Sequence, residues 1–479
     1  MKKFLEKYSI YLLILAFTLL YSAWSVNRHN HFGTDAVDLG IFDQPLWHLS
    51  RFEPPLSSIK YNQFPGANLF GDHFHPILIL ASALFWLWDD VRILLILQAV
   101  VVCLAALPLY KIAMKILQNQ ALSLAVIFSY LTFIGLQAAL DYDFHETALA
   151  VLPLAVALYA LVFSRFRLFW LSFVLGLLFK EDMPLYFFFI GALAALRFRK
   201  YRIGILTMIL AAAYYLLVTQ KIIPYFKGDR FAYEELPPEL GKTTVDLIKT
   251  TVISPWKTFL AMFFPILKLK TILNYLASFS FLPLFDPLSL ILTIPNGLAR
   301  FLTQLPQRWI IRFQYGAVLA PLLSFGTIYG VRNILSLIER RARVQKYVSR
   351  VLVLALLAAP LIETGRTGTP LFKMLNPQYY SDSPAYQINR ELLARIPKDA
   401  SIMAQSAFVP HLTHRAEIYR YEDTLLPQTQ PQYILMSLEE HSDPPYTLDQ
   451  LTERVERLKT DPRYGIIYWD GIRLLMEKK

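Results

Sequence analysis

The amino-acid sequence predicts a polytopic α-helical membrane protein that ends in a small soluble α/β domain. Hydrophobic residues make up 55% of its 479 residues and charged residues only 17%, which is too apolar for an ordinary soluble protein. Apolar runs long enough to cross a membrane alternate with short basic blocks, the pattern of a chain that crosses several times. From residue 370 onward this pattern gives way to mixed polar and apolar segments.

Charge and cysteine content exclude other classes of protein. The net charge is +11, but the basic residues cluster between apolar runs, where they orient helices against the cytoplasmic leaflet. We therefore expect no nucleic-acid partner. The single cysteine, Cys103, lies inside an apolar run, so neither a disulfide framework nor a thiolate metal site is expected.

The first apolar run predicts a retained membrane span. Residues 8–26 follow the basic start MKKFLEK, and this run is too long for a signal peptide and lacks a small-residue cleavage site. The N-terminus is then cytoplasmic, and residues 27–75 form a polar and aromatic first outer loop. Residues 76–88 are apolar but short, which favours an interfacial helix over a crossing.

Basic blocks place the next crossings. Lysines and arginines on the cytoplasmic side, at 111–115 and 165–167, bracket three apolar runs of span length. We expect these spans at 93–110, 121–140 and 147–163. The DYDFHE segment, residues 141–146, then emerges on the outer side.

Residues 168–196 predict a hairpin of two short helices. The charged segment Lys180, Glu181 and Asp182 interrupts this apolar run, and basic clusters flank it on both sides. A single span would put three charges at the bilayer centre and basic clusters on opposite sides of the membrane. A hairpin keeps both clusters inside and carries the charged tip to a protein-lined place on the outer side.

The remaining apolar runs bring the expected total to about 11 spans within a transmembrane domain of residues 1–365. The sequence predicts a span at 203–219, an outer loop at 220–265 that contains KGDRFAYEELPPELGK, and two proline-bounded crossings around 281–295. The last two spans are expected at 316–331 and 347–362.

Residues 370–479 predict an extracytoplasmic α/β domain. Ser383 and Pro384 are a good cap and first-turn pair for a helix that runs to Ile396. ASIMAQ and QYILMSL are typical of short strands, and residues 447–459 have helical periodicity. Two apolar strands around the dipeptide Asp470-Gly471 predict a hairpin.

In this topology the chemically useful side chains face one side of the membrane. Carboxylates, imidazoles and cations at several helix ends can build a site that deprotonates an acid while holding an anionic ligand. The candidate residues are Asp35, Asp38, Asp72, His73, His75, Asp143, His145, Glu146, Lys180, Glu181, Asp182, Arg308 and Arg312.

Some of these residues are also candidate metal ligands. His73 and His75 alternate, and His145 adjoins Glu146 near Asp143. No dedicated metal spacing is present, and the oxygen-rich set favours Mg²⁺ or Mn²⁺ over structural zinc. Asp38 precedes an amphipathic stretch, where a helix N-terminus would favour an ionised carboxylate suited to a general base or metal ligand.

Several segments together resemble a prokaryotic membrane-protein family called domain of unknown function 2079. They are TDAVDLGIFDQPLW, GDHFHPILIL, DFHETALAVLPLAVALYAL, KED and IPKDASIMAQSAFVPHLTHRAEIY. That family is similar in layout to the GT-C superfamily of membrane glycosyltransferases, which use polyprenyl-phosphate-linked sugars. The resemblance implies that Asp38, or else Asp35, is the catalytic acid of the first outer loop. It also implies that Asp143 and Glu146 occupy the second acidic position and that Lys180 contacts a phosphate.

The implied activity is transfer of a sugar from a polyprenyl-phosphate donor to a glycan, lipid or protein acceptor at the outer face of the plasma membrane. Lys180, Arg308 or Arg312 would hold the donor phosphate, and inversion of the anomeric centre would follow from attack on its opposite face. Two alternatives stay open. A lipid or solute transporter would show inverted repeats, and a non-catalytic scaffold would leave the candidate side chains dispersed.

Overall fold

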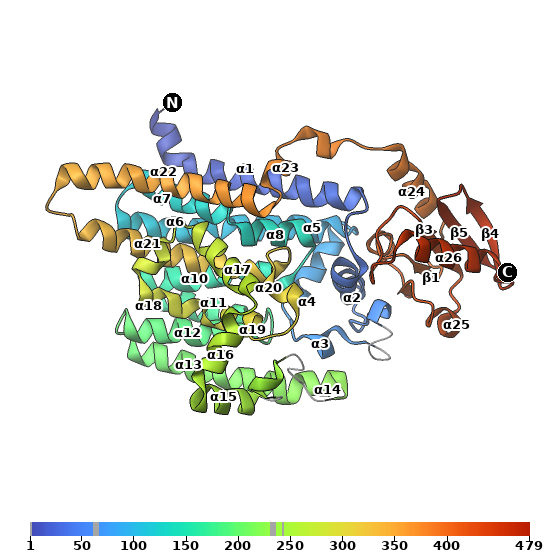
Figure 1. The fold of residues 1–479 in the computed structure, drawn as a ribbon, viewed down its shortest axis with the longest axis horizontal. Coiled ribbons are helices and arrows are strands. Elements are labelled where there is room, and N and C mark those ends of the chain that lie inside the picture. Colours follow the sequence, from blue (N-terminus) through green and yellow to red (C-terminus); the bar gives the residue numbers. More distant parts are fainter. Residues whose placement is uncertain (1, 61–66, 230–235, 242–243) are drawn as a thin grey trace.

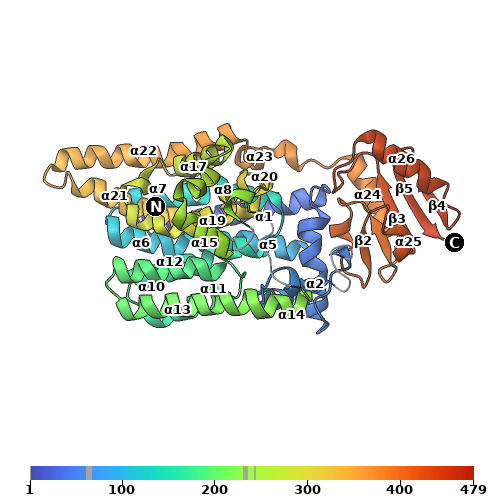
Figure 2. The ribbon, with the colours of Figure 1, turned by 60° about the horizontal axis from the view of Figure 1, so that its bottom comes forward.

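The protein is a bundle of helices with a compact sheet-containing domain at one end, as Figure 1 and Figure 2 show. The computed structural model describes residues 2–60, 67–229, 236–241 and 244–479. The mostly helical class and the small C-terminal sheet agree with the sequence prediction. We call the end of the bundle that adjoins this sheet the domain end.

Six helical segments in the described residues are long and apolar enough to cross a membrane, or seven if one bent pair is a single span. Three further apolar helices are shorter. The expected count of about 11 spans is therefore not confirmed, and the orientation across the membrane stays a prediction. The six are Tyr8–Asn30, Arg92–Leu117, Gln120–Tyr142, Tyr201–Lys227, Gln314–Ser336 and Ala342–Thr367; the shorter three are Glu146–Val162, Phe166–Leu177 and Met183–Leu196.

The N-terminal half follows the predicted order of apolar runs. Most runs are divided into two helices. Between two runs, Asn119 caps the next helix by accepting from the Leu122 backbone N–H at 3.1 Å. The expected interfacial helix of residues 76–88 is two short turns. The elements are α1 (Lys2–Asn30), η1 (Ala36–Gly40), α2 (Ile41–Ser50), η2 (Ser58–Lys60), α3 (Leu69–Asp72), α4 (Leu78–Ser82), η3 (Ala83–Trp86), α5 (Arg92–Leu104), α6 (Ala106–Leu117), α7 (Gln120–Leu131), α8 (Ile134–Tyr142), α9 (Glu146–Leu149) and α10 (Val151–Val162).

The predicted hairpin is present as α11 (Phe166–Leu177) and α12 (Met183–Leu196). Its helices pack closely, since a Cβ on Gly176 would lie 2.1 Å from the Phe187 ring. The charged tip lies between the two helices. After α12 the chain turns back as α13 (Tyr201–Leu217), which packs along α12.

The prediction for residues 220–302 was wrong in its details. Instead of a plain loop and two crossings at 281–295, the structure has a helical extension, a helix pair bent by 72°, and a series of short turns. The bend falls at Pro265, and further prolines divide the later run, because proline lacks the N–H that a continuous helix needs. The KGDRFAYEELPPELGK segment lies partly outside the described residues. The elements are η4 (Val218–Ile222), α14 (Ile223–Lys227), η5 (Pro238–Leu240), α15 (Thr244–Ile253), α16 (Pro255–Phe263), α17 (Ile266–Ala277), η6 (Leu282–Phe285), α18 (Pro287–Leu290), η7 (Ile291–Thr293) and α19 (Ile294–Phe301).

The last two long helices coincide with the spans expected at 316–331 and 347–362. The second of them returns the chain to the domain end. Gly368, with φ of 71°, ends the second of them in the left-handed conformation that favours glycine. The elements are α20 (Pro306–Trp309), η8 (Gln314–Gly316), α21 (Leu319–Ser336), α22 (Ala342–Thr367), α23 (Leu371–Met374) and η9 (Pro377–Tyr380).

The C-terminal domain contains a five-stranded mixed sheet of order β2-β1-β3-β5-β4. Strand β1 (Ile402–Ala404) is parallel to β2 (Ile418–Arg420) and β3 (Tyr433–Ser437). Strand β5 (Arg473–Lys478) is antiparallel to both β3 and β4 (Tyr464–Trp469). The sheet is accompanied by α24 (Pro384–Ala394), η10 (Val409–His411), α25 (Leu426–Thr429) and α26 (Leu448–Lys459).

Most local predictions for this domain are confirmed. Ser383 caps α24 by accepting from the Tyr386 N–H, and Thr447 forms a capping box at α26. The β4–β5 hairpin turns at Gly471, whose φ is 92°. Strand β2 was not predicted, because its three residues carry too little periodicity. A hydrophobic core joins one face of the sheet to the helices, and a second core fills its other face.

Candidate functional site

The loop of residues 27–75, called the first outer loop after its predicted position, starts the site with a capped helical turn. Asp35 is the N-cap of η1, and its Oδ1 accepts from the Val37 N–H at 2.8 Å. The same oxygen accepts from the Ser406 hydroxyl at 2.8 Å, and Oδ2 lies 3.3 Å from His441 Nε2. Burial raises the pKa of Asp35, but the bonds from His441, Val37 and Ser406 outweigh burial and lower it overall. Asp35 is thus held by the C-terminal domain.

Asp38 lies one turn further on and contacts a different element. Its Oδ1 is 2.9 Å from Nε2 of His145, and the Asp38 side chain is 13% exposed. The His145 N–H donates to Oε1 of Gln98 at 2.7 Å, so the fully buried Gln98 on α5 fixes the backbone of this histidine. Asp38 and His145 are 107 positions apart in the sequence.

Asp143 contacts the start of the same turn, η1. Its carboxylate accepts from the Asp35 backbone N–H at 2.9 Å and pairs with the Arg28 guanidinium. The Asp143 side chain is fully buried. Burial raises the pKa of Asp143 to about 7, because the lowering effect of Arg28 does not compensate for lost hydration and the nearby Asp38.

Lys180, at the hairpin tip, enters the site beside Glu146. Its Nζ lies 3.4 Å from Glu146 Oε1, and His75 Nδ1 lies 3.8 Å from the same oxygen. Burial alone would lower the pKa of Lys180, but Glu146 and the carboxylates of residues 181 and 182 outweigh burial and raise it. Burial also lowers the pKa of His75, whose ring is 1% exposed.

The other two hairpin-tip residues have different surroundings. Glu181 pairs with Nδ1 of His73 at 2.7 Å and accepts from the Phe74 N–H at 3.3 Å. Burial raises the pKa of Asp182 to about 6 despite the nearby lysine. Asp72 pairs with Lys60, which gives this part of the loop its own ion pair. The hairpin tip and the GDHFHP segment are therefore joined directly.

Aromatic packing connects these two groups of polar residues. The Phe42 ring on α2 lies 5.4 Å from the His145 ring and 5.5 Å from the His75 ring, between centroids. His145 and Glu146 are also adjacent in sequence. The structure thus brings DAVDLGIFD, GDHFHP, DYDFHE and the hairpin tip together.

The two predicted arginines lie apart from this set. The Arg308 carbonyl accepts from Arg300 Nε at 2.7 Å, and Arg312 lines a separate cavity with Lys270 and Arg366. The same segment nevertheless approaches the site further along, because Tyr315 contributes to the charge environment of Lys180.

Several residues that position the site are not among the candidate site residues, although the sequence places Asp43 in the same loop as Asp35 and Asp38. The fully buried Asp43 accepts from the Thr413 hydroxyl and lies 3.3 Å from His414 Nε2. Gln98 was missed although it is a lone amide inside an apolar run, the signal that marks a polar residue with a partner inside a membrane protein. Ser406 carried no signal, because its partner is 371 residues away.

The described residues contain no group of three or more His, Cys, Asp or Glu side chains arranged to hold a metal ion. The candidate ligands are instead used in pairs, such as His145 with Asp38 and His73 with Glu181. The expected Mg²⁺ or Mn²⁺ stays a prediction.

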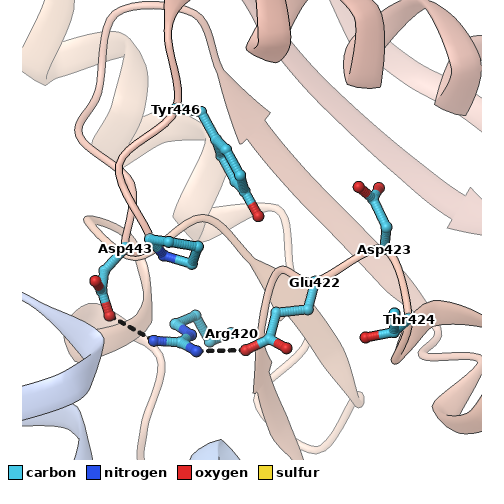
Figure 3. A pocket seen from close by; sticks show the side chains of 7 residues that line it. Arg420, Glu422, Asp423, Thr424, Asp443 and Tyr446 are labelled. Atoms are coloured by element: carbon cyan, nitrogen blue, oxygen red, sulfur yellow. Dashed lines mark hydrogen bonds and ion pairs between the residues drawn. The ribbon is translucent and has the colours of Figure 1, made fainter.

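A polar cavity of the C-terminal domain borders the site. It has a volume of about 450 Å³, and Arg420 lies at its base between Glu422 and Asp443, as Figure 3 shows. The Tyr446 hydroxyl points into it from the opposite wall. Burial raises the pKa of Asp443, with a further contribution from Asp35 and Asp38, which places this wall near those two aspartates.

Comparison with solved structures identifies the layout. ArnT from Cupriavidus metallidurans bound to undecaprenyl phosphate matches with a TM-score of 0.51 and 11% sequence identity, over 98% of each chain. Apo ArnT from the same organism matches with a TM-score of 0.47 and 12% identity, over 97% of each chain. The first likeness confirms the GT-C-like fold expected from the sequence.

Sequence comparison identifies the family. No curated protein sequence matches the chain. The family described as "Predicted membrane protein (DUF2079)" matches residues 28–473. This match includes the first outer loop, the hairpin tip and nearly all of the C-terminal domain. The protein therefore belongs to the DUF2079 family of membrane proteins.

Proposed function

We propose that the protein is a membrane glycosyltransferase that moves a sugar from a polyprenyl-phosphate donor to an acceptor hydroxyl. The observation that carries the proposal is the convergence of Asp38, His145 and Lys180 from three distant segments at the domain end. The fold is like that of ArnT, which was crystallised with undecaprenyl phosphate. That likeness supports a polyprenyl-phosphate lipid as the donor class.

Asp38 is the proposed general base. It contacts His145, and its side chain is 13% exposed. The Asp35 side chain is 21% exposed, but both of its oxygens have partners in η1 or the C-terminal domain. Asp35 therefore fits a positioning role, and Asp38 fits the group that meets the acceptor. The imidazole of His145 holds the Asp38 carboxylate in one orientation.

Lys180 is the proposed contact for the donor phosphate. Its ammonium lies at the tip of a helix hairpin and is partly neutralised by Glu146 at 3.4 Å. A cation held there opposes the charge that develops on a departing phosphate. Arg308 and Arg312 were expected to share this role. Arg312 instead lines a separate cavity, and we assign the role to Lys180, which lies beside Glu146.

The proposed reaction is a single displacement. The acceptor oxygen forms a bond to the anomeric carbon as its proton moves to Asp38. The bond from that carbon to the phosphate oxygen breaks, and the lipid phosphate leaves with the electron pair beside Lys180. Attack opposite the leaving group inverts the anomeric centre.

The same convergence weighs against a non-catalytic scaffold. A scaffold would leave Asp38, His75, His145 and Lys180 dispersed, and the structure instead links them through Phe42 and Glu146. A transporter stays the alternative, because broken helices and buried charges also serve carriers.

The decisive experiment is a donor-cleavage assay in proteoliposomes. Wild type and Asp38→Asn are supplied with undecaprenyl-phosphate-linked sugars and a cell-envelope acceptor extract, and release of undecaprenyl phosphate is measured. We expect release by wild type and a loss of about 100-fold or more in the variant, since general base catalysis contributes that much. The exposed Asp449→Asn, in α26, is the matched control. Equal release by wild type and Asp38→Asn would remove Asp38 from the proposed role.

A further inference from the structure

A second polar cavity lies on the transmembrane part of the protein. It has a volume of about 590 Å³ and is bordered by α8, α17, the end of α22 and the segment before η8. On α17, residues Leu267, Lys270, Thr271 and Asn274 line it at the spacing of one helix face. None of the candidate residues at the hairpin tip lines this cavity.

The cavity is strongly cationic. Lys270, Arg312, Arg366 and Lys373 line it, and its one carboxylate is Asp141. That carboxylate already accepts from the Trp24 indole N–H at 2.9 Å.

Three of the four cations are uncompensated. Arg366 pairs with Glu363 at 2.5 Å, but within the described chain no ion pair or hydrogen bond engages the side chains of Lys270, Arg312 or Lys373. Cations from three separate segments thus face one space without a carboxylate partner. Such an arrangement favours an anion, and the hydroxyls of Thr271 and Thr367 add donors that suit phosphate oxygens.

Apolar surface continues from this cavity along the outside of the bundle. Leu267, in its wall, is 42% exposed, and Leu273 on the same helix is also 42% exposed. Ile362, one helical turn before Arg366 on α22, is 59% exposed, and Phe372, next to Lys373, is 52% exposed. In a membrane protein such residues face acyl chains. The anion that fits here therefore carries apolar chains.

We propose that this cavity binds the phosphate of an anionic lipid, at a site separate from the donor-phosphate contact at Lys180. The phosphate lies among Lys270, Arg312 and Lys373, and the lipid chains lie against the exposed faces of α17 and α22. Clustered lysine and arginine side chains near a membrane surface attract acidic lipid headgroups.

The two sites are neighbours. Arg312 lines the cavity, and the next residue, Phe313, packs its ring 4.7 Å from Tyr142. Asp143 follows Tyr142 directly, and His145 lies three residues after it. The contact between Phe313 and Tyr142 therefore joins a segment that lines the cavity to the segment that carries Asp143 and His145.

Native mass spectrometry of the full-length protein in mixed micelles tests the proposal. The probes are dioleoyl phosphatidic acid, dioleoyl phosphatidylcholine and inorganic phosphate. The test variant combines Lys270→Gln, Arg312→Gln and Lys373→Gln. The matched control removes three exposed charges elsewhere, with Arg340→Gln, Arg343→Gln and Lys346→Gln.

We expect wild type to prefer phosphatidic acid over phosphatidylcholine and the test variant to lose about 100-fold in affinity, given the contribution of each basic residue near a charged headgroup. The control and Lys180→Gln should keep the wild-type affinity. Equal losses in the test variant and the control would assign binding to general surface charge and overturn the proposal.

Two further results would also contradict it. Inorganic phosphate that displaces phosphatidic acid at equal concentration would show a free-anion site rather than a lipid site. A loss of binding in Lys180→Gln equal to that of the test variant would show that only the donor site exists. Arg312→Lys keeps the charge and should retain binding. It keeps the proposal testable if the test variant folds poorly.

Discussion

At the scale of single residues, the aspartates of the first outer loop have different surroundings. Asp35 caps η1 and contacts Ser406 and His441 of the C-terminal domain, whereas Asp38 contacts His145 from the helix bundle. Asp35 and Asp38 are three residues apart, and residue type alone would not distinguish their roles. Their partners assign positioning to one and the proposed proton transfer to the other.

The proposed phosphate contact predicts how a Lys180 variant changes KM and kcat. Lys180→Gln should raise the KM for a polyprenyl-phosphate sugar and lower kcat, by about 10- to 100-fold in kcat/KM, because the charge-assisted contact binds the donor phosphate in the ground state and strengthens as charge develops on the departing phosphate in the transition state. Lys346→Gln, on the exposed start of α22, is the control. Steady-state kinetics with varied donor measure both constants. An unchanged kcat/KM would place the donor phosphate elsewhere.

Asp143 gives a pH-dependent prediction for stability. Its pKa is raised from 3.8 to about 7, so between these values the folded protein keeps a proton that the unfolded chain releases. The contribution of Asp143 to the free energy of unfolding is therefore largest below pH 4 and falls as pH rises to 7, by roughly 4 kcal/mol at most. The measurement is thermal unfolding of wild type and Asp143→Asn in detergent across this range. A constant difference between the two proteins would contradict the raised pKa.

At the scale of elements, the pairing of α12 with α13 holds the hairpin tip in place. Gly191 and Gly204 face each other, and a Cβ on Gly204 would lie 2.5 Å from the Gly191 carbonyl oxygen. Small residues of this kind let membrane helices approach closely. The position of Lys180, three residues before α12, depends on this contact.

The contact predicts a specific effect of one methyl group. Gly204→Ala should lower the free energy of unfolding by about 1 to 3 kcal/mol, because the helices must separate to accommodate the Cβ, and it should weaken donor binding. Gly297→Ala in α19 is the matched control, because a Cβ there meets no atom within 4 Å. Thermal unfolding and donor affinity are the measurements. Equal stability of the two variants would show that the α12–α13 contact is not close.

At the scale of the whole molecule, the C-terminal domain completes the site rather than lying apart from it. Gln44 Nε2 donates to the Arg415 carbonyl at 3.2 Å, and the Ser58 hydroxyl donates to the Ile418 carbonyl at 2.6 Å. Together with the bonds of Asp35, these contacts fasten the first outer loop to the sheet. The order of the proposed base therefore depends on docking of the domain.

His414 makes part of this docking sensitive to pH. It lies 3.3 Å from Asp43 and 2.9 Å from Asp89. Burial lowers the pKa of His414 and Arg51 adds to this, but the two aspartates outweigh both and raise the pKa above 6.5. Its stabilising contribution is thus complete below pH 6.5 and is lost as pH rises through the raised pKa.

Hydrogen exchange of the interface measures this effect. Protection of residues 409–418 in wild type should fall as pH rises from 6.5 through the raised pKa of His414, after correction for the intrinsic exchange rate. His414→Gln should show lower protection with no such pH dependence. A wild-type pH dependence that persists in His414→Gln would assign the effect to another group.

The sequence by itself determined the membrane class, the positions of most apolar helices, the hairpin at 168–196 and the local structure of the C-terminal domain. These features depend on composition, span length, basic blocks, caps and turn residues, all of which act over a few neighbouring residues. The candidate residues at 35–38, 72–75, 143–146 and 180–182 were found for the same reason, because charges are rare between apolar runs.

Only the tertiary structure decided how those residues combine. The pairing of Asp38 with His145, the anchoring of Asp35 by Ser406 and the placement of Arg312 in a separate cavity join segments far apart in the chain. The proline-divided segment at 281–302 likewise packs as short turns, not as spans. Contacts between distant segments depend on how the helices pack, and a hydropathy pattern carries no information on which helices become neighbours.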